Sequence, residues 1–211
     1  MRNEILGKKL GMTQIFANNG LVVPVTVVEA GPVSILQKKT EENDGYKALK
    51  VAFKETRESL LNKAEMGEFK KANVSSKKYV REIESKNYDE LNVGDQINCG
   101  IFTEGEKVDV TGYTRGRGFT GVIQRWNNHR HRMTHGVSIV HRASGSMGAN
   151  STPSRVFKNK NMPGHYGVER VTIQNLEIVK VDTDRNVVLV KGCIPGPKGS
   201  IVTIREAKKG N

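Results

Sequence analysis

The residues of this 211-residue chain that are best suited to binding chemistry lie in one segment, residues 110–168. These 59 residues include nine Lys or Arg, all five histidines and nine glycines, but no Asp or Glu. If the chain's 22 acidic residues were distributed evenly, about six of them would lie in this segment. Guanidinium and ammonium donors without competing carboxylates suit phosphate groups. The segment is therefore expected to bind an anion, and the net charge of +12 favours nucleic acid.

The first glycines of this segment match a nucleotide-binding pattern. Residues 116–121 read G-x-G-x-x-G after a possible strand at 108–111. A dinucleotide fold also needs an acidic residue about 20 positions later, and the region around His141 has none. Arg115 and Arg117 alternate with glycines instead, which favours backbone and guanidinium contacts to phosphates. A flexible linker is the alternative.

The clustered histidines raise the possibility of a metal site, because four of them are close in sequence: His129, His131, His135 and His141. Arg130 and Arg132 stand between them, and no nearby carboxylate could support the ligands. We therefore predict no metal and no cofactor. Stacking on bases or donation to phosphates is one interpretation of these histidines, and solvated surface residues are the other.

Two further features of the segment each allow two interpretations. Trp126, the only tryptophan, could stack on an unpaired base or could anchor the base of the segment on the rest of the protein. The serine-rich stretch 144–150 superficially resembles a nucleophile site, but Ser144 stands where the first glycine of G-x-S-x-G is required. Small residues with glycines fit a narrow loop between crowded backbones better than they fit a hydrolase.

Outside residues 110–168 the chain is nearly neutral, with 25 Lys or Arg against 22 Asp or Glu. No window approaches 18 apolar residues, and the charged start lacks the apolar stretch of a signal peptide. A soluble cytoplasmic protein without membrane contact is expected. Cys99 and Cys193 are too few to staple the chain, and they are expected to be reduced and at buried strand or strand-end positions.

The same outer parts predict short strands joined by turns. Asn18-Asn19-Gly20 separates strands at 13–16 and 21–28, and Asn43-Asp44-Gly45 separates strands at 33–37 and 48–53. Further strands are expected within 91–110 and at 171–179, 187–190 and 201–204. Their regular spacing predicts a mainly β protein with a closed β-barrel.

Two regions depart from the strand pattern. Mixed charges with near-helical apolar spacing predict a small helical insertion at about residues 55–88. Residues 111–167 lack either periodicity and are too long for an ordinary connection, which predicts an irregular extension that orders on binding. Residues 1–110 and 168–211 would then form the globular barrel domain.

Motifs spread over nearly the whole chain resemble the bacterial large-subunit ribosomal protein L-three family. The helical insertion matches the pattern weakly. The motifs lie in the family's order and read Gly7-Lys8-Lys9-Leu10-Gly11-Met12-Thr13, Val108-Asp109-Val110-Thr111-Gly112, Gly118-Phe119-x-Gly121, Arg125-Trp126, Thr134-His135-Gly136, residues 138–142, Gly145-Ser146-x-Gly148, Thr152-Pro153, Val156-Phe157-Lys158, Gly164-His165, Arg170-Val171-Thr172-x-Gln174-Asn175-Leu176 and Val190-Lys191-Gly192.

The resemblance implies a structural constituent of the large subunit rather than an enzyme. It implies a translation-protein type barrel, direct binding to 23S rRNA, nucleation of early 50S assembly and an extension that reaches toward the peptidyl transferase centre. Neighbouring large-subunit proteins would be partners, and no small-molecule substrate is expected. Some family members carry a methylated glutamine in the tip of the extension, and residues 148–153 contain no glutamine.

The residues expected to carry these roles fall into two groups. Those expected to contact rRNA are Lys8, Lys9, Arg115, Arg117, Arg125, Trp126, Arg130, His131, Arg132, His135, His141, Arg142, Arg155, Lys158, Lys160 and His165. Those expected at the tip near the peptidyl transferase centre are Ser144, Gly145, Ser146, Met147, Gly148, Ala149, Asn150 and Ser151.

Two rival functions remain to be tested against this interpretation. A nucleotide-using oxidoreductase or hydrolase built on the glycines and histidines would retain mononucleotide. A general DNA-binding module would bind duplex DNA and ribosomal RNA equally well at physiological salt, since charge alone does not separate them.

Overall fold

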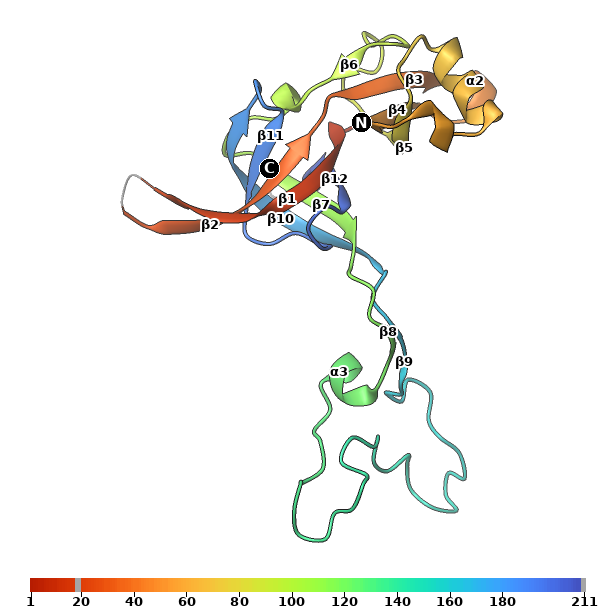
Figure 1. The fold of residues 1–211 in the computed structure, drawn as a ribbon, viewed down its shortest axis with the longest axis vertical. Coiled ribbons are helices and arrows are strands. Elements are labelled where there is room, and N and C mark those ends of the chain that lie inside the picture. Colours follow the sequence, from red (N-terminus) through yellow and green to blue (C-terminus); the bar gives the residue numbers. More distant parts are fainter. Residues whose placement is uncertain (18–19, 210–211) are drawn as a thin grey trace. The chain divides into compact units, whose positions relative to one another are not determined.

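A computed structural model describes residues 1–17 and 20–209 of the chain. Its internal contacts divide into two compact units (Figure 1). The barrel unit comprises Met1–Tyr113 together with Arg170–Asn211, and the basic unit comprises Thr114–Glu169. Each unit is described by itself.

The barrel unit contains a closed barrel of six antiparallel strands in the order β1-β12-β7-β10-β11-β2 (Figure 1). The prediction of a mainly β protein with a closed barrel is confirmed. Alternate β-branched side chains point inward, and Val108, Val110 and Ile204 are fully buried. The strands are β1 (Glu4–Phe16), β2 (Val22–Ala30), β7 (Lys107–Tyr113), β10 (Arg170–Asp182), β11 (Val187–Lys191) and β12 (Ile201–Glu206).

Strands β1 and β2 form the first predicted hairpin, paired from Gly7 opposite Ala30 to Phe16 opposite Val22. Both strands are longer than predicted. Asn18 and Asn19 of the proposed turn lie outside the described residues. The backbone amide of Ala17 donates to the Leu21 carbonyl at 2.9 Å, which closes the described part of the hairpin end.

A second sheet in the same unit has the strand order β5-β4-β3-β6. Its strands are β3 (Val33–Lys39), β4 (Ala48–Glu55), β5 (Lys77–Ile83) and β6 (Gln96–Ile97). The second predicted strand pair, β3 and β4, is antiparallel as expected. The connection contains one helical turn, α1 (Glu41–Asp44), and Gly45 ends it with a φ of 80°, a conformation that glycine adopts at little cost.

The predicted helical insertion is shorter than residues 55–88. Its helical part is η1 (Glu58–Leu60) and α2 (Lys63–Lys71), and α2 begins at a capping box between Asn62 and Glu65. The prediction was wrong from Lys77 to Ile83, which is strand β5 paired with β4. Charged residues alternate with the β-forming residues of this segment, so its strand pattern was not recognised. Pairing with β5 satisfies backbone N–H and C=O groups of β4 that would lack partners if the segment were a helix.

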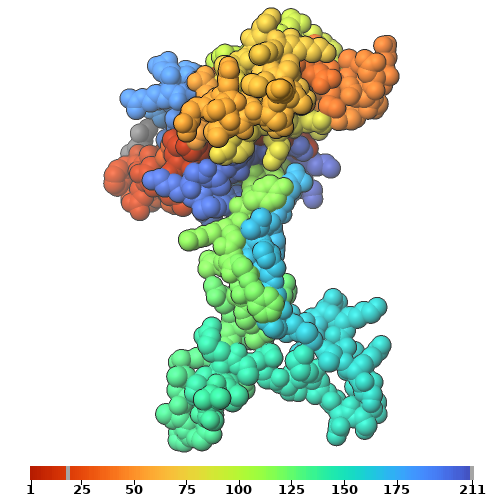
Figure 2. Space-filling model, turned by 45° about the vertical axis from the view of Figure 1, so that its right-hand side comes forward, coloured from red at the N-terminus to blue at the C-terminus, as the bar shows by residue number. Residues whose placement is uncertain are grey.

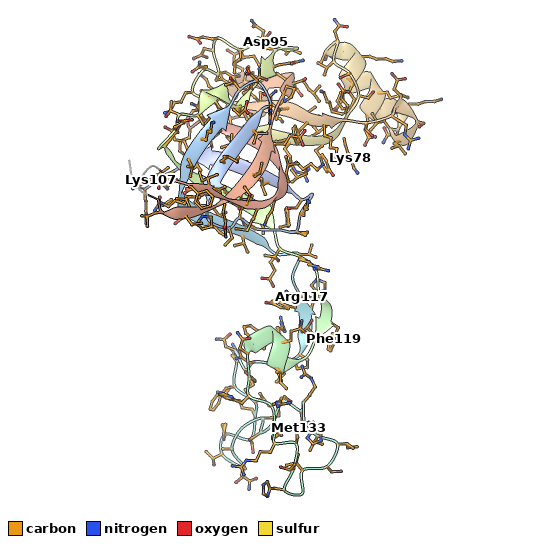
Figure 3. All side chains as sticks on the ribbon, turned by 60° about the vertical axis from the view of Figure 1, so that its left-hand side comes forward. Lys78, Asp95, Lys107, Arg117, Phe119 and Met133 are labelled. Atoms are coloured by element: carbon orange, nitrogen blue, oxygen red, sulfur yellow. The ribbon has the colours of Figure 1, made fainter. Side chains whose placement is uncertain are left out.

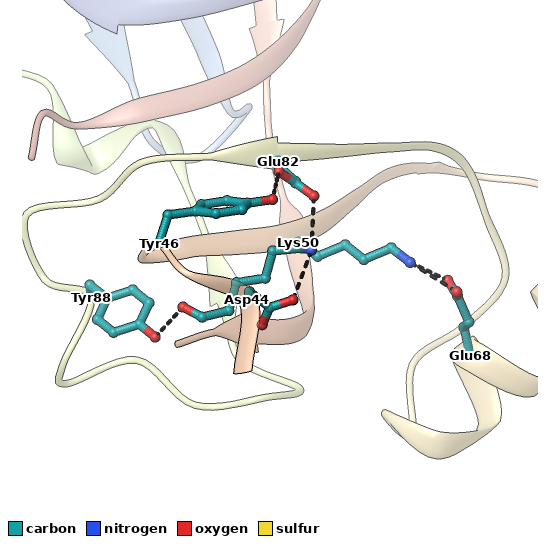
Figure 4. Close-up of polar contacts among 7 residues, drawn as sticks. Asp44, Tyr46, Lys50, Glu68, Glu82 and Tyr88 are labelled. Atoms are coloured by element: carbon teal, nitrogen blue, oxygen red, sulfur yellow. Dashed lines mark hydrogen bonds and ion pairs between the residues drawn. The ribbon is translucent and has the colours of Figure 1, made fainter. Parts of the chain in front are cut away.

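Charged side chains of the second sheet are paired with one another. The Lys50 ammonium lies 2.7 Å from the Glu68 carboxylate on α2, and the Tyr46 hydroxyl donates to Glu82 at 2.8 Å (Figure 4). Lys39 contacts both Asp44 and Glu82. The hydrogen bond to Asp44 contributes most to raising the pKa of Lys39 above its usual value. The charges of this sheet therefore hold its own elements together.

The two cysteines differ in environment, and neither is in a disulfide. Cys99 begins the short helix η2 (Cys99–Ile101) and is buried, and burial raises the pKa of its thiol. The expectation of a buried position was wrong for Cys193, which is exposed in the loop after β11. Its neighbour Ile194 fills the buried position instead.

Candidate nucleic-acid interface

The basic unit begins and ends in a narrow two-stranded stem. Strand β8 (Gly118–Thr120) pairs with β9 (Gly164–Tyr166) in antiparallel register. At the two ends of the unit, the Thr114 amide donates to the Glu169 carbonyl at 2.9 Å. The antiparallel pairing is incompatible with the parallel strand-helix-strand unit that a dinucleotide fold requires.

Glycines allow the two sides of the stem to approach each other. A Cβ on Gly167, whose φ is +83°, would lie 2.0 Å from the Arg115 carbonyl oxygen. A Cβ on Gly116 would lie 2.9 Å from the Val168 side chain. Close packing within the stem therefore favours glycine at both positions, and the approach of the Gly116 and Gly118 backbone to phosphates stays a prediction.

The short helix α3 (Val122–Trp126) ends in a contact that fixes Trp126. The Trp126 indole N–H and the Arg125 Nη1 both donate to the Met162 carbonyl oxygen, at 3.0 and 2.9 Å. The Arg125 guanidinium also lies 5.0 Å from the centre of the Trp126 ring. The tryptophan is thus held by a partner in its own unit that sequence reasoning did not identify, and its ring remains 45% exposed.

Four of the five histidines, His129, His131, His135 and His141, lie in one loop region. The His131 amide donates to the His141 carbonyl at 3.0 Å, and the His141 Nδ1 lies 2.9 Å from the Arg132 carbonyl oxygen. Within the described part of the chain, no group of three or more His, Cys, Asp or Glu could hold a metal ion. His135 has a φ of 59° at a bend of the same loop.

The predicted tip, residues 144–151, is exposed along its whole length. Its hydrogen bonds are local: the Ser146 hydroxyl donates to the Gly148 carbonyl at 3.0 Å, and the Ser154 hydroxyl donates to the Ser151 carbonyl at 2.7 Å. No bond between a histidine and Ser144 or Ser146 occurs among the described residues. The arrangement therefore offers a surface for a partner and no activated nucleophile.

The nine Lys and Arg of the basic unit have no acidic partner. Glu169 is its only acidic residue, and every ion pair among residues 1–17 and 20–209 joins residues of the barrel unit. Figure 3 shows Arg117 on the stem beside the exposed Phe119. Unneutralised cations repel one another and favour an anionic partner. The nine are Arg115, Arg117, Arg125, Arg130, Arg132, Arg142, Arg155, Lys158 and Lys160.

The basic unit also exposes apolar side chains that a folded core would bury. Val122 is its only buried apolar residue among those described. In the space-filling view, open solvent separates the green-to-cyan loops of this unit (Figure 2). Apolar and aromatic groups beside cations suit the faces of unpaired bases. The exposed ones are Phe119, Trp126, Met133, Ile139, Val140, Met147, Val156, Phe157 and Val168.

Of the two predicted contacts on the barrel unit, Lys9 has a structural use. Its ammonium donates to the carbonyl oxygens of Ile194 and Gly196 at 2.8 and 2.9 Å, which ties down the loop before β12. Lys8 instead lies near Lys54 and lowers the pKa of that residue by repulsion. RNA contact by any of the predicted residues stays a prediction.

The fold and the site together define a class of protein, in which a barrel with its own core carries a cationic unit suited to a polyanion. A family model described as ribosomal protein L3 matches residues 94–186. The chain is also 50% identical over 210 residues to the large ribosomal subunit protein uL3 of Acetivibrio thermocellus, with 99% of each chain covered.

This chain therefore belongs to the ribosomal protein L3 family. Members of that family are structural ribosomal proteins, and this chain is located in the cytoplasmic ribosome. Among the described residues, no helix is both long and apolar enough to cross a membrane.

Proposed function

We propose that the chain is a structural constituent of the large ribosomal subunit that binds 23S rRNA directly through its basic unit. The observation that carries the proposal is that, among the described residues, Thr114–Glu169 combines nine cations that have no acidic partner with a single buried apolar residue. Such a unit gains little from internal packing and much from phosphate neutralisation. The near-complete match to a large-subunit protein supports the same conclusion.

Residues 111–167 act as the extension that enters the RNA, and residues 144–151 form its tip toward the peptidyl transferase centre. Early ordering of the extension around rRNA would let the chain nucleate 50S assembly. Recognition depends on RNA shape and unpaired bases, because the deep groove of A-form duplex hides the base edges from side chains. Peptide transfer belongs to the RNA, and the protein is a scaffold with neighbouring ribosomal proteins around it.

The proposal is tested by sucrose-gradient fractionation of a cell lysate, with this protein detected in each fraction before and after a high-salt wash. Comigration with large subunits that survives the wash is expected of an integral component. Recovery only in the light soluble fractions would contradict the proposal and return attention to the enzyme interpretation. Release by salt alone would indicate a peripheral, purely electrostatic association.

A further inference from the structure

A groove of about 620 Å³ lies within the barrel unit, between strand β5 of the second sheet and strands β1, β7, β10 and β12 of the barrel. Its volume is in the range of small-ligand sites. Tyr79 and Arg81 line it from β5, and Tyr113 and Arg170 line it as cross-strand neighbours on β7 and β10.

The acidic residues of this groove are already neutralised by other groups. The Glu4 carboxylate accepts two hydrogen bonds from Arg205, at 2.9 and 3.1 Å, and one from the Glu84 amide. Glu82 is held by Tyr46 and Lys39 (Figure 4). The described residues give Arg81 and Arg170 no carboxylate partner. The Arg81 Nη1 donates to the Val80 carbonyl oxygen at 3.0 Å, and the other N–H groups of the two guanidinium groups can bind an anion.

The groove also offers surfaces for a sugar and a base. Thr111, Ser200 and Thr203 line it. The Thr111 hydroxyl is hydrogen bonded to that of Thr172, and the Ser200 hydroxyl donates to the Pro197 carbonyl, which leaves lone pairs on these oxygens as acceptors. Tyr113 is 52% exposed, so its ring face is open to a planar group. Tyr79 is half-buried, and the Lys78 ammonium lies 5.5 Å from its ring centre. Cations, hydroxyls and aromatic faces together match the parts of one nucleotide.

Lysines near the groove add positive charge. Lys8 pairs in register with Ile201, which lines the groove. Lys8 lowers the pKa of Lys54, Lys78 adds to this repulsion, and Glu29 offsets it only in part. Figure 3 shows Lys78 on the second sheet. Lys54 also has a φ of 63°, an unusual conformation for a non-glycine residue within a strand. The local field therefore favours a phosphate.

We propose that this groove receives an unpaired nucleotide of ribosomal RNA, with Arg81 and Arg170 on phosphates and Tyr113 stacked on the base. The inference rests on the proposed function, because it assigns a second RNA contact to the same protein. The groove is the barrel unit's own RNA site. None of its lining residues belongs to Thr114–Glu169.

The test uses the full chain and 23S rRNA, with affinity measured over a series of salt concentrations. Replacing Arg81 and Arg170 together by alanine is expected to reduce the magnitude of the log-log salt slope by roughly 1.4 to 1.8, for two lost phosphate contacts. The matched control replaces Lys63 and Lys71, two exposed residues of α2, by alanine. It removes the same amount of positive charge and should leave the slope unchanged. The double Arg-to-Lys variant should restore the slope.

The aromatic contact is tested separately. Tyr113→Ala is expected to weaken binding about 5- to 150-fold, and Tyr113→Phe should bind like the unaltered protein. RNA containing 4-thiouridine should crosslink to peptides that contain Tyr79 or Tyr113. Crosslinks confined to Thr114–Glu169, together with an unchanged salt slope, would overturn the groove site and leave the proposed function standing. Failure of the unaltered chain to bind 23S rRNA would overturn both.

Discussion

The barrel unit holds 25 Lys or Arg against 21 acidic residues, whereas the basic unit holds nine against one. Of the thirty buried apolar residues among those described, 29 belong to the barrel unit and one, Val122, to the basic unit. All ion pairs among the described residues lie in the barrel unit. The cations of the basic unit have no acidic partner in the described part of the chain, and Arg125 donates to a backbone carbonyl instead.

This difference indicates where each unit obtains its stability. Burial of apolar surface stabilises the barrel unit without help from a partner. The basic unit has a stem and local hydrogen bonds but almost no buried apolar surface, so its loops depend on an anionic partner to offset the repulsion of its cations. The barrel unit is the scaffold, and the basic unit is the binding element.

Removal of the basic unit should have the largest effect. Deleting residues 115–168 and joining Thr114 to Glu169 through two glycines should leave a folded barrel unit, because the two joined residues are already hydrogen bonded at 2.9 Å. We expect the thermal midpoint to change by less than about 4 °C, the shift of roughly 1 kcal/mol. The same protein should fail to support large-subunit assembly in cells, and normal gradient profiles would contradict the division of roles.

A smaller effect is expected from one methyl group in the stem. Gly167→Ala places a Cβ against the Arg115 carbonyl at a φ of +83°. The conformation alone costs about 1–2 kcal/mol, so amide exchange at Arg117 should speed up roughly 5- to 30-fold or more while the barrel amides keep their protection. Gly121→Ala is the control, because nothing lies within 4 Å of its added Cβ. Equal protection in the two variants would show that the stem does not need this close approach.

Lys8 and Lys9 are adjacent in the barrel unit, but only Lys9 is expected to contribute to its stability. Lys9→Met removes two hydrogen bonds from the ammonium to carbonyl oxygens and should lower the free energy of unfolding by about 2 kcal/mol. Lys8→Met should change it by less than about 0.5 kcal/mol, as surface substitutions usually do. Urea unfolding of both variants measures the difference, and equal values would contradict the structural role of Lys9.

The smallest effect concerns the ion pair between Lys86 and Glu206. The hydrogen bond from Lys86 holds the pKa of the Glu206 carboxyl below its usual range. A lowered folded-state pKa stabilises the protein above the unfolded value, near 4.3, and that stability disappears as pH falls through the folded value. Lys86→Met should therefore destabilise the chain slightly at pH 7, by less than about 1 kcal/mol. Unfolding free energies of the two proteins should converge as pH falls through the folded-state pKa of Glu206, and a difference that does not change with pH would contradict this pairing.

Alternating apolar residues and turn signals predicted the barrel because both act locally along each strand. The acid-free composition of residues 110–168 identified the candidate interface in the same way. Strand β5 was missed because its partner β4, and not its own mixed charges, determines its conformation. The Met162 carbonyl that holds Trp126 lies 36 residues away, and the groove combines strands from across the chain. Such contacts depend on pairing order, which the local pattern does not contain.

The salt dependence of binding to 23S rRNA shows whether the basic unit carries RNA binding. It should be measured for the full chain and for the protein that lacks residues 115–168. If all nine cations of the basic unit and the two arginines of the groove reach phosphates, the full chain should have a log-log slope of roughly −8 to −10. The shortened protein should retain a slope of about −2 or weaker, from the two arginines of the groove. Equal slopes for the two proteins would contradict the assignment of RNA binding to the basic unit.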